Sequence, residues 1–302
     1  MAAAPVQPKR VLISGASGFI GAELRRQLEA DGHTVLRLVR REPQTADEFE
    51  WDPSTMTIDA AVLDSVDAVI NLSGATLAKF PWTNAYKRTI LHSRIEPTRT
   101  LAEAIALCAT PPAVLINASA IGYYGDRPGV PVDESAPKGD GFLADVVEAW
   151  EQAARIAEPV TRVAMVRTGL VVGDGGAFTP LALATRAGLA ARMGPGTQDW
   201  PWISLYDEAA GIRHLLTSQL SGPVNLAGPQ PATSEQVTRS LARTLHRWHP
   251  LVIPSAAIRL GMGEAGEALL LTSSKVVPQA LLDDGFEFAH PTIDDAVRAV
   301  WG

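Results

Sequence analysis

The chain has 302 residues, enough to bury a sizeable core in one large domain or two modest ones. Hydrophobic residues make up 46% of the chain and charged residues 20%, which is ordinary for a soluble globular protein. The net charge of −7 excludes a general attraction to nucleic acid or to an anionic membrane, so any phosphate must be bound locally. Cys108 is the only cysteine, so no disulfide forms within the chain, and a reducing cytoplasm is the expected compartment.

After an expected disordered tail at residues 1–9, the chain is predicted to open with a βαβ unit over residues 10–41. An apolar run at 11–13 predicts a buried strand, and the sequence GASGFIG follows at 15–21. A helix is expected next, with Leu24 and Leu28 on one face and Gly32 beyond its end. A second apolar run at 35–39 completes the unit.

The three glycines of this turn fit the phosphate groups of a dinucleotide. Gly15 permits a tight turn, Gly18 lets the backbone approach a pyrophosphate, and Gly21 lets the helix pack closely on the sheet. The free N–H groups and the positive dipole end of the helix also favour an anion. An ordinary glycine-rich turn is the alternative. The strand before the glycines and the helix after them argue against that alternative.

The end of the second strand indicates which dinucleotide is bound. A ribose with a free 2′-hydroxyl is usually held by Asp or Glu at this point, whereas a 2′-phosphate requires Arg. Here Val39 is followed by Arg40 and Arg41, whose guanidinium groups match phosphate geometry, and Ser17 offers a hydroxyl donor. Two solvated arginines are the alternative. The sequence therefore predicts NADP(H) as the cofactor.

Strands and helices alternate through most of the remaining chain. Buried strands are expected at 66–72, 114–117 and 162–170, and helices at 84–107, 142–157, 177–192, 207–218, 234–247 and 292–301. Residues 42–64 and 126–141 are expected to be irregular. The alternation predicts an α/β fold with a doubly wound parallel sheet. We expect one domain over 9–172, completed by about 201–229, and a smaller lobe over 173–200 and 230–302.

Motifs recur in order along nearly the whole chain: GASGFIG at 15–21, WDP at 51–53, INLSGA at 70–75, SRIEPTRTL at 93–101, SAIGYYG at 119–125, FLADVVEAWE at 142–151, VRTGLVVGDGGAF at 166–178, GPGTQDWPWISLYD at 194–207 and GFEFAHPTIDDAV at 285–297. Together they resemble the atypical branch of the extended short-chain dehydrogenase/reductases, the epimerase-family or nucleoside-diphosphate-sugar-epimerase-like proteins. The resemblance implies an NADP-binding Rossmann-type domain with a smaller C-terminal substrate lobe.

By position, the resemblance also implies which residues bind the cofactor. These are Gly15, Ser17, Gly18, Phe19 and Ile20 at the pyrophosphate, Arg40 at the 2′-phosphate, Leu72, Ser73 and Gly74 on the adenosine and ribose side, Arg94 on its helix, and Leu170 near the nicotinamide. A solvated helix arginine is the alternative for Arg94. No metal is expected, because the six histidines show no metal-ligand spacing.

The resemblance is incomplete at the proton relay. Typical members use a Ser, and a Tyr and a Lys four residues apart on the following helix, where the Tyr is the general acid or base. Ser119 falls at the serine position, but Phe142 and Val146 stand where the Tyr and the Lys belong. Either Tyr123 or Tyr124 is a candidate for the missing phenol, and we select Ser119 and Tyr124 as candidate catalytic residues. An aromatic wall of the substrate cleft is the alternative for the tyrosines.

Three functions are compatible with this sequence. The first is an NADP(H)-dependent oxidoreductase or epimerase-like enzyme on a small carbonyl or sugar-like substrate, since the hydride chemistry belongs to the cofactor. The second is a noncatalytic NADP(H)-binding redox sensor or regulatory module. The third is an interaction protein without nucleotide binding, against which the glycines and Arg40 argue. The sequence favours the enzyme, with a small-molecule substrate and without nucleic-acid or membrane partners, and leaves its substrate, proton donor and oligomeric state open.

Overall fold

Eight strands form one sheet in the computed structural model, which describes residues 7–302; residues 1–6 of the expected tail lie outside this range. The strand order is β12-β8-β6-β5-β1-β2-β3-β4, and every neighbouring pair is parallel except β3 and β4. The strands are β1 (Arg10–Ser14), β2 (Thr34–Val39), β3 (Glu48–Asp52), β4 (Thr57–Ile58), β5 (Ala68–Asn71), β6 (Val114–Ala120), β8 (Arg162–Thr168) and β12 (Gly222–Leu226). The predicted α/β fold with a doubly wound parallel sheet is confirmed.

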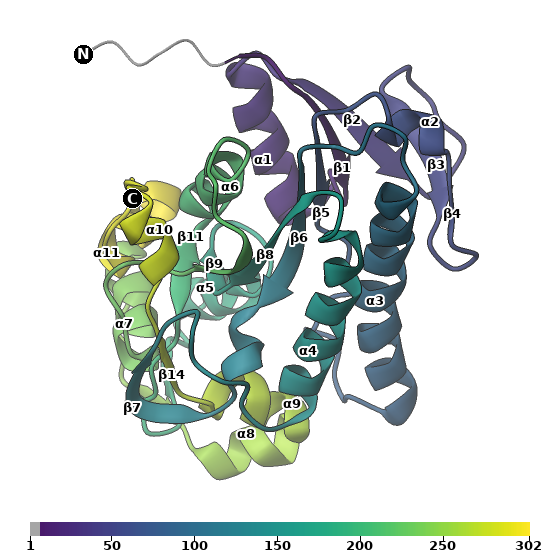
Figure 1. Ribbon diagram of the computed structural model, residues 1–302. Coiled ribbons are helices and arrows are strands. Elements are labelled where there is room, and N and C mark those ends of the chain that lie inside the picture. The colour runs from purple at the N-terminus through teal and green to yellow at the C-terminus, as the bar shows by residue number, and fades with distance from the viewer. Residues whose placement is uncertain (1–6) are drawn as a thin grey trace.

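Helices cover both faces of this sheet. On one face lie α1 (Phe19–Ala30) and α6 (Leu205–His214), and on the other lie α3 (Asn84–Ala106) and α4 (Phe142–Ala154) (Figure 1). Successive side chains of a strand point to opposite faces. Val11 and Ile13 of β1 therefore pack in the core with α1 and α6, whereas Leu12 packs in the core with α3.

The strand order reverses between β1 and β5, and open α/β sheets bind ligands at such a point, beyond the carboxyl ends of the strands. Ser14, Asn71 and Asn117 lie opposite one another in register on β1, β5 and β6. The glycine turn follows β1, and residues 72–75 follow β5. The topology thus brings these separate motifs to one edge of the sheet.

Short elements outside the main sheet make up much of the chain beyond β8. They are β9 (Leu170–Val172), α5 (Phe178–Arg186), β10 (Ala191–Met193), β11 (Trp202–Ser204), α7 (Ser234–Thr244), β13 (Leu251–Ile253), α8 (Ser255–Met262), α9 (Glu264–Gly266), a π-helical turn at Glu267–Leu271, β14 (Ser274–Val276), α10 (Gln279–Asp283) and α11 (Ile293–Trp301). β7 (Arg127–Val132) pairs with β14, so the segment after β6 also contacts these elements (Figure 1).

Three segments differ from the sequence-based prediction. Residues 42–64 contain β3, β4 and the short helix α2 (Ala60–Leu63), and residues 126–141 contain β7. They were not predicted because β7 (RPGVPV) holds two prolines and a glycine and β3 (EFEWD) holds three acidic residues, which are depleted in strands. The helix expected over 177–192 ends at Arg186, and residues 191–193 form β10. Gly188 has a φ of +82°, which is incompatible with continuing a right-handed helix.

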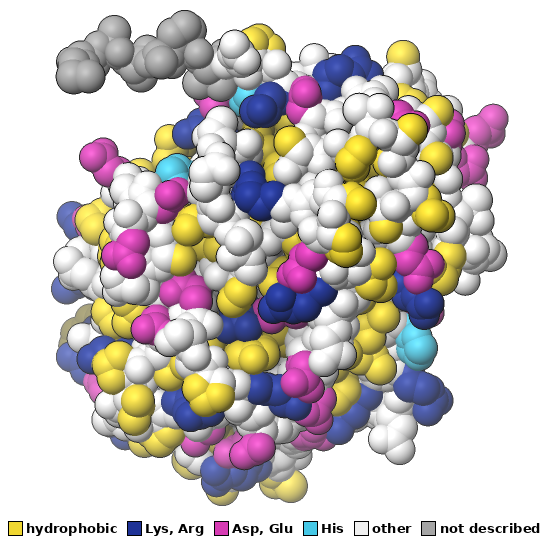
Figure 2. Space-filling view, in the orientation of Figure 1, with side chains coloured by type: hydrophobic (Ala, Val, Ile, Leu, Met, Phe, Trp, Pro, Cys, Tyr) yellow, Lys and Arg dark blue, Asp and Glu magenta, His cyan; other side chains and the backbone are white. Residues whose placement is uncertain are grey.

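Within residues 7–302, no helix combines the length and apolar composition needed to cross a membrane. No three His, Cys, Asp or Glu side chains in this range are arranged to hold a metal ion. Figure 2 shows basic and acidic side chains interspersed over the face that it presents, in keeping with binding by local groups rather than by one large charged surface.

Candidate functional site

The glycine turn between β1 and α1 leaves no room for a side chain at Gly15 or at Gly21. Gly15 has a φ of +75°, and a Cβ there would lie 2.9 Å from the carbonyl oxygen of Leu72. A Cβ on Gly21 would overlap the carbonyl oxygen of Gly15, so α1 packs directly on the turn. Ser17 and Gly18 are exposed at the start of α1. The turn therefore presents the helix N-terminus, with its free N–H groups, to the crevice beyond the carboxyl ends of β1 and β5.

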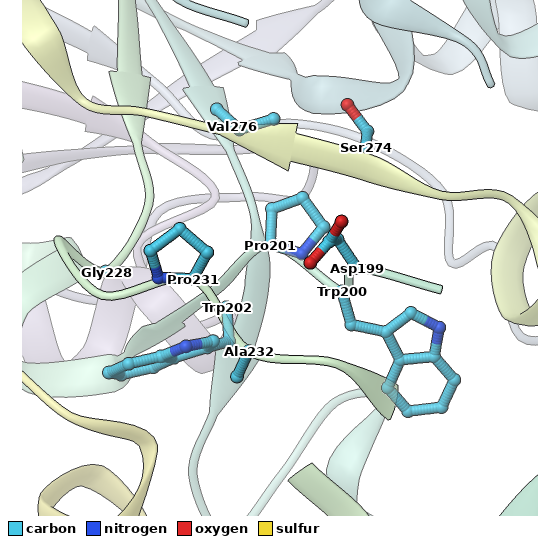
Figure 3. Close-up of a pocket in the computed structure, with 9 residues that line it drawn as sticks. All are labelled: Asp199, Trp200, Pro201, Trp202, Gly228, Pro231, Ala232, Ser274 and Val276. Carbon is cyan, nitrogen blue, oxygen red and sulfur yellow. The ribbon is translucent and has the colours of Figure 1, made fainter. Parts of the chain in front are cut away.

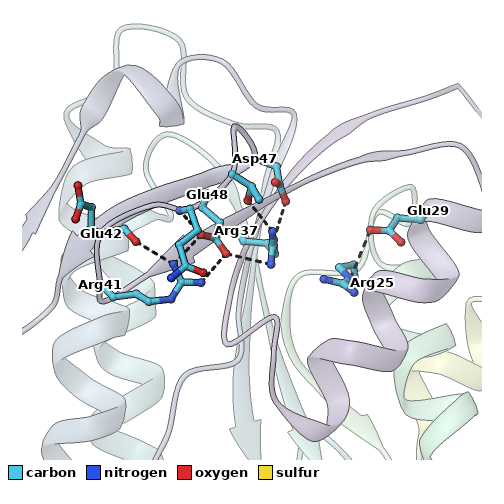
Figure 4. Close-up of polar contacts among 9 residues, drawn as sticks. Arg25, Glu29, Arg37, Arg41, Glu42, Asp47 and Glu48 are labelled. Carbon is cyan, nitrogen blue, oxygen red and sulfur yellow. Dashed lines mark hydrogen bonds and ion pairs between the residues drawn. The ribbon is translucent and has the colours of Figure 1, made fainter.

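Of the three arginines near the end of β2, two are engaged by carboxylates. Arg41 donates to both carboxylate oxygens of Glu48 at 2.8 and 2.7 Å, and these hydrogen bonds lower the pKa of Glu48 to about 2. Arg37 donates to Asp47 at 2.7 Å (Figure 4). Arg40 is exposed and has no hydrogen bond or ion pair with any residue in 7–302. Its guanidinium group is therefore free to bind a phosphate.

Arg94 on α3 is partly buried beside the loop that follows β5. Its guanidinium donates to the backbone carbonyl groups of Ile90 at 3.0 Å and Ala75 at 3.1 Å, and it lies 5.3 Å from the ring centroid of Trp150. A Cβ on Gly74 would lie 3.5 Å from its Cζ atom. Burial lowers the pKa of Arg94 to about 10, so the group is a cation at neutral pH. Within the described chain no carboxylate pairs with it, which leaves it available to an anion beside residues 73–75.

A polar row holds the carboxyl ends of the central strands together. Ser14 donates to the Asn71 side-chain carbonyl at 2.6 Å, and Asn71 donates to that of Asn117 at 2.7 Å. Ser73 donates to the Ser14 hydroxyl at 3.0 Å, and Thr98 of α3 bonds both asparagines. Because these groups satisfy one another, the loop at residues 72–74 is fixed relative to the glycine turn.

A second polar row crosses β6, β8 and β12, where Ser119, Arg167 and Asn225 lie opposite one another in register. Glu151 of α4 accepts two hydrogen bonds from Arg167, both at 2.8 Å, and one from the Ser119 hydroxyl at 2.7 Å. Ser119, Glu151 and Arg167 are each buried. The Ser119 hydroxyl is thus committed to a carboxylate inside the protein.

The two tyrosines after β6 differ in their surroundings. Tyr124 is fully buried, and its hydroxyl donates to the Asn225 side chain at 2.7 Å and accepts from Arg167 at 3.0 Å. Burial raises the pKa of Tyr124 to about 12, although Arg167 acts in the opposite direction. Tyr123 is partly exposed, and its ring centroid lies 3.6 Å from Cζ of Arg167.

Phe142 and Val146 lie in an apolar cluster where α4 meets α9. Val146 is buried with Trp82, Ile90 and Ala265, the last of these on α9. Phe142 packs edge-on against Trp82, with ring centroids 5.8 Å apart. Tyr86 packs against the same cluster, and Nζ of Lys87 lies 4.9 Å from the centroid of the Phe142 ring and pairs with Glu264.

The glycine-rich loop after β9 lies against the start of α1. A Cβ on Gly173 would come within 2.6 Å of the Phe19 ring, and one on Gly175 would overlap that ring. Leu170 begins β9, two residues beyond the end of β8. Phe19, Ile20 and Leu170 are all partly buried, so this side of the crevice is apolar.

Two hollows lie outside this edge. The small gap drawn in Figure 3 has no room for a water molecule. Its lining residues are Asp199, Trp200, Pro201, Trp202, Gly228, Pro231, Ala232, Ser274 and Val276. It therefore has no space for a ligand. A depression of about 410 Å³ on the surface lies between α7 and α11, where Arg243 is paired with Asp294.

Glu151, Arg167 and Asn225 form one network that the sequence did not predict. The available signal was a charged residue in otherwise apolar surroundings: Arg167 ends the apolar run 163–166, and Glu151 follows Trp150 on the buried face of its helix. A buried charge requires a partner, but its identity depends on the sheet register, which a single sequence does not reveal.

The reversed strand order, the glycine turn and the helix N-terminus beside it define a dinucleotide-binding α/β protein. Residues 11–227 match the model of the NAD dependent epimerase/dehydratase family. The chain belongs to this family. Residues 253–300 match a domain of unknown function, DUF1731.

Relatives align along almost the entire chain. The epimerase family protein MT2273 of Mycobacterium tuberculosis is 42% identical over 290 residues, which cover 95% of this chain and 96% of the relative. The human epimerase family protein SDR39U1 is 33% identical over 296 residues, 96% of this chain and 99% of the relative. The resemblance to the epimerase-family proteins is therefore confirmed.

Solved structures show the same fold. The crystal structure of human SDR39U1 (isoform 2) with NADPH has a TM-score of 0.89 and 33% identity, with 96% of this chain and 98% of that chain covered. A nucleoside-diphosphate sugar epimerase from Corynebacterium glutamicum has a TM-score of 0.79 and 31% identity, with 96% of this chain and 57% of that chain covered.

Proposed function

We propose that the protein is an NADP(H)-dependent oxidoreductase or epimerase-like enzyme that acts on a small carbonyl or sugar-like substrate. The main observation in favour of NADP(H) is that the guanidinium group of Arg40 is free, whereas the neighbouring Arg41 is bound by Glu48. The human SDR39U1 structure with NADPH supports the same cofactor. In this proposal residues 9–172 and about 201–229 bind NADP(H), and residues 173–200 and 230–302 form the substrate lobe.

Each part of the crevice has a role in this proposal. The turn residues bind the pyrophosphate, Arg40 binds the 2′-phosphate, and Arg94 neutralises an anionic group beside residues 72–74. Leu170 provides an apolar contact for the nicotinamide, which supplies or accepts the hydride. The turn residues are Gly15, Ser17, Gly18, Phe19 and Ile20.

The proposal assigns Ser119 and Tyr124 to the support of the site and not to proton transfer. Both hydroxyls are buried and bonded to groups inside the protein, and the pKa of Tyr124 is raised to about 12. A general acid must reach the reacting atom and be matched to the working pH. In this proposal the proton comes from the substrate or from water.

Titration of the purified protein with NADPH and with NADH tests the cofactor. Removing a charge-assisted contact costs about 1.5–3 kcal/mol, so Arg40→Ala is expected to weaken NADPH binding by about ten- to a hundredfold and to leave NADH binding nearly unchanged. Arg41→Ala is the matched control, because it removes the neighbouring cation that Glu48 holds. Equal losses in the two variants would contradict the role of Arg40.

Activity is tested by following oxidation of NADPH with a panel of small aldehydes, ketones and keto sugars. Turnover that is lost in Arg40→Ala at low NADPH and regained at high NADPH would support the enzyme, because that variant is weakened in binding alone. NADPH binding without turnover on any member of the panel would instead favour a noncatalytic redox sensor.

A further inference from the structure

Glu208 is a carboxylic acid in the apolar interior between α6 and the main sheet. Its side chain is fully buried in the first turn of α6, which packs along α1, the helix that follows the glycine turn. Its Oε1 accepts a hydrogen bond of 2.7 Å from the Thr168 hydroxyl, whereas its Oε2 is buried with no partner. An unpaired buried polar atom costs roughly 1–3 kcal/mol. This oxygen therefore requires an explanation.

No cation compensates Glu208 within residues 7–302. Asp207 accepts from the backbone N–H groups of Ala289 and His290 and from Ser204. The other charged or titratable groups on the elements around Glu208 make their own contacts; they are Arg213 and His214 on α6, Glu23, Arg25, Arg26 and Glu29 on α1, Arg162 and Arg167 on β8, and His290 in the C-terminal segment. β9 and β11 carry no titratable side chain, and Tyr206 points its ring toward His290. Desolvation raises the pKa of Glu208 to about 8, so the acid is neutral at pH 7.

We infer that Glu208 is a positioning residue of the cofactor site, whose neutral form holds Thr168 at the carboxyl end of β8 and keeps α6 packed on α1. This inference rests on the proposed binding of NADP(H). Thr168 lies two residues before Leu170, on the nicotinamide side, and α1 carries the turn for the pyrophosphate. Glu208 is thus bonded to the end of β8, and the helix that carries it packs on α1, which follows the turn.

Ionisation of Glu208 places an uncompensated charge in this interface. The charge is relieved when water enters or when α6 moves away from the sheet, because a carboxylate is far better solvated by water than by apolar side chains. Either event loosens Thr168 and α1. If NADPH binds the neutral form, its affinity falls as the pH rises through about 8, approaching tenfold per pH unit above that value.

The test measures the Kd of NADPH for the full chain between about pH 7 and 9.5, where the cofactor's 2′-phosphate is already fully ionised. Wild type is expected to lose about tenfold or more in affinity over this range, and Glu208→Gln, which copies the neutral acid, is expected to lose almost none. Thr168→Val removes a hydrogen bond that lowers the pKa of Glu208, so its decline is expected at higher pH. Glu134→Gln is the matched control: burial also raises the pKa of Glu134, but this carboxylate bonds the backbone N–H groups of Asn225 and Ala280 instead.

A second measurement needs no variant. Titration calorimetry of wild type with NADPH near pH 8, in two buffers of different ionisation enthalpy, is expected to show uptake of a fraction of one proton on binding. A constant wild-type Kd over the pH range with no proton uptake, or the same decline in Glu208→Gln, overturns the role of Glu208. Failure of NADPH to bind at pH 7 refutes the proposed function instead, so the two failures are distinguishable.

Discussion

Arg167→Met is expected to destabilise the protein strongly, because it removes the partner of a buried carboxylate. The side chains of Arg167 and Glu151 are 3% and 5% exposed. Glu151 accepts two hydrogen bonds from Arg167 on β8 and one from Ser119 on β6. Breaking a buried ion pair by removing one partner costs about 3–5 kcal/mol. The variant also loses the donor to the Tyr124 hydroxyl. We therefore expect the free energy of unfolding to fall by at least 3 kcal/mol.

Urea unfolding at pH 7, followed by circular dichroism, measures this loss. Arg99→Met is the matched control, because the Arg99–Glu103 pair is 55% and 38% exposed and such a pair contributes about 0–1 kcal/mol. Adding Glu151→Met to Arg167→Met is expected to recover much of the stability, since two apolar side chains then replace the unpaired charge. A loss below about 1 kcal/mol in the single variant, or a further loss in the double variant, would refute the reasoning.

Three further predictions follow from single contacts. The pKa of Glu208 rises from 4.5 to about 8 on folding, so its stabilising effect is complete below pH 4.5 and is lost as the pH rises through about 8. The loss is on the order of 5 kcal/mol, and it should be absent from a pH series of urea unfolding on Glu208→Gln. Gly175→Ala displaces the Phe19 ring and is expected to weaken NADPH binding several-fold with little change in Tm, which fluorescence titration and a thermal melt would check. Tyr124→Phe removes the bond to Asn225 and should cost about 1–2 kcal/mol in urea unfolding while any NADPH oxidation persists; complete loss of turnover in a folded variant would contradict its structural role.

The sheet and its cofactor edge could be predicted from the sequence because local patterns specify them. The roles of the glycines at 15, 18 and 21 could be predicted because close backbone contacts within one turn require them. The role of Arg40 could be predicted because it follows the end of a strand. The difference between Arg40 and Arg41 could not be predicted, because it depends on Glu48 of the neighbouring strand. The distinct environments of Tyr123 and Tyr124 depend in the same way on Arg167, which the register places beside them.

Glu208 illustrates a further limit of prediction from the sequence. In the sequence it is one of two adjacent acids at the start of a helix, where acidic residues are favoured and usually solvated. Only the packing of α6 against the sheet shows that Asp207 is bonded to backbone N–H groups while Glu208 is buried with a single donor. Equal local propensity therefore led to opposite environments, and tertiary contacts decided between them.

Phe142 and Val146 stand where typical family members have the Tyr and the Lys. They pack against Trp82 and against α9. Val146 is buried with Ala265 of α9, so a lysine at position 146 would place a cation among apolar side chains, while the neighbouring Glu264 is already paired with Lys87. Such a charge is costly unless it is paired or exposed to water. An apolar residue at position 146 therefore fits the contact between α4 and α9. Tyr86 and Lys87 are titratable groups at this cluster, and the Tyr86 hydroxyl donates to the backbone carbonyl of Thr76, next to residues 72–75.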